Sequence, residues 1–303
     1  GDAYLLALDE LIQAKRPIDA LALAREAAKD QAQTRPSLVA SWVLLAISAR
    51  DGASAEEACR VAISSGRVGE VVTSLGQIAP ALRTDGSPTA DELAFIVATA
   101  FGSMRLDDDA DRLYLLALKH NPDHAWSNNN LGYRWLERAD KFGEAYWMIF
   151  RAHRDLPDEP AVIDSMGWAR YVAGIYDDKP VPHARAPIEG AVTLLQRAAD
   201  AMLDRPDPEV YEHLGDALFR AGRPDGARKA WEQALALTRQ MQARADAAAN
   251  VSLEAIDALR ARMEGLHKRL DALVAGQGPP VAPVFGHGEE PPRPPEQPAG
   301  PVS

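Results

Sequence analysis

Apolar and small residues recur along this chain at alternating intervals of four and three positions. The pattern returns four times, each time as an alanine, a large apolar residue four positions later and a second alanine three positions after that. Because these intervals keep side chains on one face of an α-helix, each trio predicts the buried stripe of a helix. The trios are Ala110/Tyr114/Ala117, Ala145/Ile149/Ala152, Ala191/Leu195/Ala198 and Ala227/Trp231/Ala234. Every periodic segment runs at helical spacing, which predicts an all-α protein.

A column of small residues keeps step with these stripes. Its members are Ala98, Gly132, Gly167 and Gly215, and each of the three glycines follows a large apolar residue. A glycine at such a position lets two helix backbones approach closely. Pro122, Pro157 and Pro206 close three of the units, because proline lacks an N–H and disfavours helix at the residue before it. The pattern therefore predicts pairs of tightly packed helices that repeat about every 34 residues.

Together these columns resemble the tetratricopeptide repeat, whose W-x2-L-G-x2-Y … A-x3-F … A … P pattern is typical of a helix–turn–helix unit. The resemblance implies units stacked into a solenoid. It covers residues 89–241 well, as four clear units, and residues 1–66 weakly, as two degenerate units. Residues 67–88 are expected to form an extra helix and a linker. The third clear unit is lengthened by the stretch 177–189, whose prolines predict an exposed loop that folding does not require.

Beyond the repeats, residues 242–276 carry one more helical stripe. Its apolar residues alternate spacings of three and four: Ile256, Leu259, Met263, Leu266, Leu270 and Leu273. Two interpretations stay open, a helix that caps the end of the solenoid and a coiled-coil helix that pairs two copies through 253–273 in a homo-oligomer. Residues 277–303 contain nine prolines, and we expect them to form a disordered tail.

Charge and composition narrow the range of partners. The chain has 44 acidic and 33 basic residues, a formal net charge of −11, which disfavours binding to nucleic acid and to anionic membranes. No stretch is long and apolar enough to predict membrane insertion. The single cysteine, Cys59, excludes an intramolecular disulfide and is expected to be a buried thiol. Since the chain begins at Gly1, we expect it to be a soluble piece of a longer product, either cytoplasmic or exported.

The sequence offers little that would support catalysis. Asp164, Ser165 and His213 are the residue types of a hydrolase triad, but no strained nucleophile turn or oxyanion hole accompanies them. His120 and His124 are separated by a predicted turn, so they should not share a helical face that binds zinc. No phosphate-binding loop or dinucleotide-binding motif occurs. We therefore expect no enzyme activity, no cofactor and no metal.

The resemblance also implies that the protein acts through the concave groove lined by the first helix of each unit. The candidate partner-binding residues are Trp126, Asn129, Tyr133, Asp164, Trp168, Tyr171, Glu209, Glu212 and Asp216. The aromatic residues would anchor a protein or peptide, and the carboxylates would favour Lys or Arg beside the apolar anchors. Asp164 and Glu212 stand where chaperone-binding relatives carry basic residues, so an acidic tail peptide is not expected as the ligand.

These features predict a non-catalytic scaffold or adaptor that binds a peptide segment or a folded partner. The alternatives are a regulatory or substrate-positioning module of a larger enzyme, and a structural protein that self-assembles through its C-terminal helix. Two arrangements would make the aromatic residues of the groove inaccessible to a partner. Trp126 or Trp168 could tuck between repeats, or the C-terminal helix or tail could occupy the groove, with Pro291–Pro295 stacked on its aromatic residues.

Overall fold

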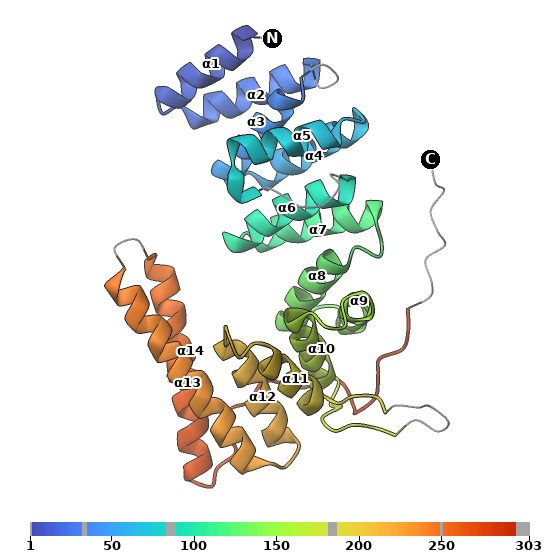
Figure 1. The fold of residues 1–303 in the computed structure, drawn as a ribbon, viewed down its shortest axis with the longest axis vertical. Coiled ribbons are helices and arrows are strands. Elements are labelled where there is room, and N and C mark those ends of the chain that lie inside the picture. The colour runs from blue at the N-terminus through green and yellow to red at the C-terminus, as the bar shows by residue number, and fades with distance from the viewer. Residues whose placement is uncertain (1, 32–34, 83–88, 181–186, 249–250, 295–303) are drawn as a thin grey trace. The chain divides into compact units, whose positions relative to one another are not determined.

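The computed structural model describes residues 2–31, 35–82, 89–180, 187–248 and 251–294. Within these ranges the regular elements are helices, apart from one isolated β-bridge, so the all-α prediction is confirmed. The chain divides into two compact units, Gly1–Leu131 and Gly132–Ser303, here called unit 1 and unit 2. Figure 1 labels the helices in chain order.

Unit 1 is built from helix pairs in which consecutive helices pack on one another. The helices are α1 (Asp2–Gln13), α2 (Pro17–Gln31), α3 (Pro36–Ser48), α4 (Gly52–Ser64), α5 (Val68–Ile78), α6 (Ala90–Ser103), α7 (Asp107–His120) and the first half of α8 (Ala125–Glu137). α5 is the extra helix expected after the two degenerate repeats; it packs on α3, and a short 3-10 turn, Pro80–Leu82, follows it.

Trp42 shows how the degenerate repeats hold together. Its side chain is fully buried, and its indole Nε1 donates to Ser54 Oγ at 2.7 Å. The backbone of Ser54 is in turn bonded to Asp51, the N-cap of α4, at 2.9 Å, so one contact joins the core to the start of the second helix. Cys59 is fully buried on the same helix, as expected, and burial raises the pKa of its thiol to about 12.

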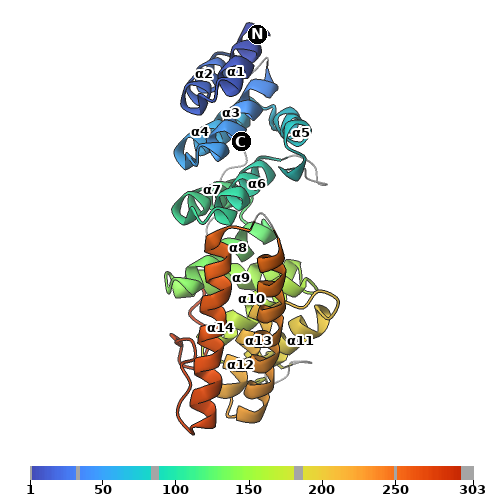
Figure 2. The ribbon, with the colours of Figure 1, turned by 90° about the vertical axis from the view of Figure 1, so that its left-hand side faces the viewer.

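Unit 2 contains the remaining helix pairs and the C-terminal segment. Its helices are the end of α8, α9 (Phe142–Asp155), α10 (Pro160–Val172), α11 (Ala191–Ala201), α12 (Pro208–Arg220), α13 (Pro224–Ala247) and α14 (Leu253–Val274). α10, α12 and α13 begin with proline, which has no N–H to leave unpaired in a first turn. α13 and α14 are long and lie side by side (Figure 2).

The small-residue column lies where the spacing predicted, at contacts between the two helices of one repeat. A Cβ atom on Gly132 would come within 2.9 Å of Ile149 Cγ1, and one on Gly215 would overlap the indole of Trp231. Ile149 and Trp231 are the central members of two of the apolar trios. The glycine column and the apolar stripe are therefore two sides of the same contact, and each requires the other.

The insertion in the third clear repeat begins and ends with residues whose backbones are hydrogen-bonded to each other. Lys179 and Ile188 exchange two backbone hydrogen bonds of 2.9 Å, and the Gly190 N–H donates to Asp178 at 2.8 Å. Residues 181–186 of the expected loop lie outside the described residues, and its dispensability for folding stays a prediction. The described part of the insertion forms a narrow hairpin-like base against α11.

α14 packs within the chain as a helix that covers the end of the repeats. Leu266 is fully buried and joins Trp231 and Leu235 in one apolar cluster. Met263, Leu270 and Leu273 pack on the same cluster, so four of the six residues in the stripe are used inside the chain. This is the capping arrangement, which keeps the apolar surface of the last repeat out of water.

Candidate functional site

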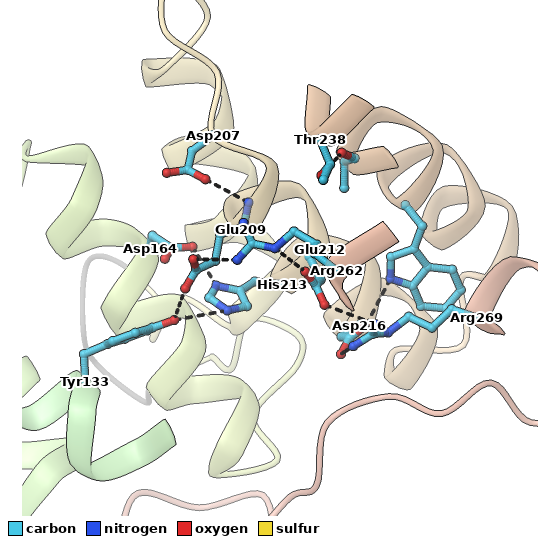
Figure 3. Close-up of polar contacts among 12 residues, drawn as sticks. Tyr133, Asp164, Asp207, Glu209, Glu212, His213, Asp216, Thr238, Arg262 and Arg269 are labelled. Atoms are coloured by element: carbon cyan, nitrogen blue, oxygen red, sulfur yellow. Dashed lines mark hydrogen bonds and ion pairs between the residues drawn. The ribbon is translucent and has the colours of Figure 1, made fainter. Parts of the chain in front are cut away.

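Three carboxylates lie on one face of α12. Glu209, Glu212 and Asp216 are three and then four positions apart, which places them along a single helical stripe. This acidic face of α12 lies opposite α14, which presents Arg262 and Arg269 to it (Figure 3). The two arginines are seven positions apart, and they also share one face of their helix.

Each carboxylate of the acidic face has a guanidinium partner. Arg262 pairs with Glu209 at 2.8 Å and with Glu212 at 3.2 Å. Arg269 pairs with Glu212 and with Asp216, both at 3.1 Å. Such charge-assisted contacts fix the position of α14 along α12. The basic groups that the sequence predicted for a partner are thus supplied here by the chain's own C-terminal helix.

A buried histidine joins α12 to α10 and to the end of α8. His213 Nδ1 lies 3.1 Å from Asp164 Oδ1, and Nε2 lies 3.4 Å from the hydroxyl of Tyr133, which donates to Glu209 (Figure 3). Burial by itself lowers the pKa of His213, but the carboxylate of Asp164, followed by that of Glu209, outweighs burial and raises the pKa to about 9. At neutral pH His213 is therefore an imidazolium held by carboxylates on two helices.

Trp168 and Tyr171 are part of this interior. The indole of Trp168 is only 6% exposed and stacks on His213 at a centroid distance of 4.1 Å. Tyr171 stacks parallel to Trp168 at 4.6 Å, and its hydroxyl donates to the carbonyl of Ala282 at 2.5 Å. The aromatic surface expected to anchor a partner is covered by neighbouring side chains and by the C-terminal segment.

Residues 277–294 form an extended segment, here called the C-terminal strap, that crosses unit 2. The N–H groups of Phe285 and Gly286 both donate to the carbonyl of Val172 at 2.9 Å, and that of Gly288 donates to Ala173 at 2.8 Å. These carbonyls end α10 and have no partner within their helix. The prediction of a disordered tail is therefore wrong for residues 277–294, because the segment pairs its backbone with a helix end; residues 295–303 lie outside the described part of the chain.

The far end of the strap is attached to α9 and α10. Glu290 accepts from Arg170 at 2.5 Å and from the hydroxyl of Tyr146 at 3.1 Å. The indole of Trp147 donates to the carbonyl of Pro291 at 3.0 Å. Within the described residues, the Pro291–Pro295 stretch thus meets Trp147 on α9 and not the groove aromatic residues on which stacking was considered.

A cavity of about 320 Å³ remains between α10, α12, α14 and the strap. Its walls are formed by Leu136, Glu137, Ala139, Trp168, Val172, Glu209, Glu212, His213, Asp216, Arg262, Arg269, Ala282, Pro283 and Phe285. Glu137 and Phe285 are exposed and mark its open side. Although Glu137 is accessible to solvent, partial burial raises its pKa, an effect that His213 reduces.

The nine predicted site residues fall into two groups. Seven of them, Tyr133, Asp164, Trp168, Tyr171, Glu209, Glu212 and Asp216, belong to unit 2 and lie in the network just described. Trp126 and Asn129 belong to unit 1, where Trp126 is half-buried and Asn129 is buried.

The sequence prediction missed Arg262, Arg269 and the strap. The seven-residue spacing of the two arginines, on a helix already expected to cap the repeats, was a signal that could have paired them with acidic residues. Nothing comparable in the sequence signalled that Glu290 would reach Arg170, since the two are 120 residues apart.

The geometry around the triad-type residues does not suit nucleophilic catalysis. Ser165 Oγ donates to the carbonyl of Ala161 at 2.9 Å, within its own helix, and His213 is bonded to Asp164 and lies next to Tyr133 rather than a serine. Among the described residues no group of three or more potential ligands gathers to hold a metal ion. No helix within the described ranges has the length and apolar character needed to cross a membrane.

Comparison with known proteins identifies the repeat. The tetratricopeptide repeat family model matches residues 208–240, which comprise α12 and most of α13. A TPR repeat-containing protein of Pseudomonas aeruginosa is 36% identical over 99 residues. That match covers 33% of this chain, and the chain spans only 14% of the length of that relative.

Solved structures with similar helices are more distant. BtubC from P. vanneervenii shares 18% identity over 81% of this chain and 95% of its own, with a TM-score of 0.46. A tetratricopeptide repeat protein from Parabacteroides merdae shares 13% identity over 87% and 98%, with a TM-score of 0.42. These similarities are too low to bear on function. The family-model match shows a tetratricopeptide repeat at residues 208–240, and the chain is similar over 99 residues to a bacterial protein that carries such repeats.

Proposed function

We propose that this protein is an interaction scaffold that binds a segment of another protein at the open side of the cavity in unit 2. Tetratricopeptide repeats present extended surfaces for protein partners. One observation carries the proposed location: the acidic face of α12 is already paired with Arg262 and Arg269, whereas Glu137 beside it stays accessible. α14 and the strap then build the binding surface and are not competitors to be displaced.

The cost of displacing the strap supports this choice. Arg170 is 6% exposed, and removal of Glu290 would leave its guanidinium buried beside Tyr146 without a carboxylate. Separating one partner from a buried ion pair costs about 3–5 kcal/mol. A partner that had to lift the strap would lose this amount from its binding free energy. A partner that binds at the cavity mouth would not.

A photo-crosslinking experiment tests the location. Phe285 lies at the cavity mouth and is 41% exposed, and Met241, on α13, is 42% exposed. p-Benzoylphenylalanine placed at position 285 should crosslink a partner protein in the cell that makes this chain, and the same group at position 241 should not. Equal crosslinking from both positions, or crosslinking only from position 241, would place the partner elsewhere.

A further inference from the structure

The charges that line the cavity do not balance. Glu209, Glu212 and Asp216 each pair with an arginine of α14. Glu137 makes no ion pair with the described residues, although the imidazolium of His213 lies near enough to influence its pKa. His213 is already held by Asp164 at 3.1 Å. The excess negative charge of the cavity is therefore located at its mouth, on Glu137.

A second polar group in the cavity wall lies beside Glu137. Trp168 is 6% exposed, and its buried N–H faces the carboxylate of Glu137, where a side-chain hydrogen bond from Trp168 opposes the rise in the pKa of Glu137. The rings of Tyr171 and His213 stack on the indole, so the N–H at its edge is the polar group it has left to offer. Trp168 therefore helps to hold the carboxylate of Glu137 at the cavity mouth.

We propose, on the basis of the scaffold function above, that this cavity is a subsite for one basic side chain of the protein partner. The carboxylate of Glu137, beside the N–H of Trp168, binds the ammonium or guanidinium group. Leu136, Val172 and Phe285 line the cavity and provide apolar contact for the methylene stem of a Lys or Arg side chain. A volume of about 320 Å³ suits one such side chain and is too small for a helix.

The electrostatics support a cation over an anion. Partial burial raises the pKa of Glu137, and the neighbouring Glu209 and Glu212 act in the same direction, while His213 and a hydrogen bond from Trp168 act against it. These effects disfavour the carboxylate form, and a bound cation would favour it again. An anionic ligand would have to approach Glu137 directly, while the arginines it might bind are already engaged with the acidic face of α12.

Small probes test this subsite in the full chain without any partner protein. N-acetyl-lysine methylamide and N-acetyl-arginine methylamide supply a basic side chain and carbonyl groups, and N-acetyl-norleucine methylamide supplies a similar stem without charge. Each is titrated while the indole N–H resonance of Trp168 is followed by NMR, with its assignment taken from Trp168→Phe. We expect a saturable shift with the basic probes and an affinity at least ten-fold lower for norleucine.

Variants of Glu137 complete the test. Glu137→Gln should weaken binding of the lysine probe at least ten-fold, and Glu137→Asp, which keeps the charge, should restore part of it. Glu232→Gln removes an exposed carboxylate on α13 and serves as the control that leaves binding unchanged. Equal binding of the norleucine probe, no saturable shift with either basic probe, or an unchanged affinity in Glu137→Gln would overturn the proposal.

The probes and the crosslinking experiment fail independently. Crosslinking from position 285 together with no probe binding would keep the scaffold site and reject the basic subsite. Probe binding without crosslinking would keep a cation-binding cavity and reject the proposed location of the protein partner.

Discussion

At the scale of single residues, charged groups in unit 2 are matched across segments that are far apart in sequence. Arg170 on α10 meets Glu290 on the strap, and His213 on α12 meets Asp164 on α10. Both pairs are largely buried, so each group depends on its partner for the solvation it lost on folding. These two contacts lead to two predictions.

Glu290→Gln should lower the free energy of unfolding by about 1–3 kcal/mol, less than full separation of the pair, because the glutamine oxygen can still accept from Arg170 but no longer carries a negative charge. The measurement is urea denaturation followed by tryptophan fluorescence. Glu289→Gln is the matched control, since Glu289 precedes Glu290 and is exposed. If both variants unfold at the same urea concentration as the parent, the strap is not held by this pair.

The stability of unit 2 should fall as the pH rises from about 6.5 to about 9. The pKa of His213 is raised from 6.5 to about 9 in the folded chain, so the native state binds the proton more tightly than the unfolded state. The resulting stabilisation is complete below pH 6.5 and is lost as the pH passes through 9. It amounts to at most about 3 kcal/mol.

Melting temperatures measured between pH 6.5 and 9.5 test the effect. His213→Gln should flatten the decline over this range, whereas His267→Gln, which changes an exposed histidine on α14, should leave it in place. An unchanged slope in His213→Gln would mean that another group causes the pH dependence.

At the scale of elements, the close packing of the two helices of one repeat requires a small residue at their contact. A Cβ on Gly215 would overlap the indole of Trp231, so Gly215→Ala should destabilise the protein by about 1–3 kcal/mol despite the higher helix propensity of alanine. Gly215→Leu should cost more.

Gly226→Ala is the matched control for the helix contact. A Cβ at Gly226 would meet only the end of Leu218, at 3.4 Å. This variant should therefore melt at or above the temperature of the parent. The same melting temperature for Gly215→Ala and Gly226→Ala would show that the contact with Trp231 is not tight.

At the scale of the whole molecule, α14 keeps the apolar surface of the last repeat out of water. It covers Trp231 and Leu235, and its removal would expose this cluster to water. A chain ending at Val251 should therefore self-associate, while a chain ending at Gly276, which keeps α14, should have the same oligomeric state as the full chain. Light scattering measures both. The opposite result, an oligomeric full chain that dissociates on loss of α14, would support pairing between copies through 253–273.

The sequence by itself determined the helical repeats, because a repeat buries its apolar face through contacts between neighbouring segments. The four-and-three stripes and the glycine column are such local contacts, and they predicted a close helix contact at Gly215, where the structure has the indole of Trp231. The resemblance to the tetratricopeptide repeat indicated the carboxylates of α12. The apolar stripe at 253–273 predicted one more helix, either a cap or a coiled coil, since spacing along one helix fixes which side chains share a face.

Only the tertiary structure decided what the groove residues do. The acidic face of α12 binds Arg262 and Arg269, Trp168 lies under His213 and Tyr171, and the strap reaches α9. Apart from the pair Trp168 and Tyr171 on α10, these contacts join segments more than 40 residues apart, and the periodicity of the sequence does not indicate them. Helical spacing gives the face of a helix on which a residue lies, but the partner on that face depends on the path of the rest of the chain.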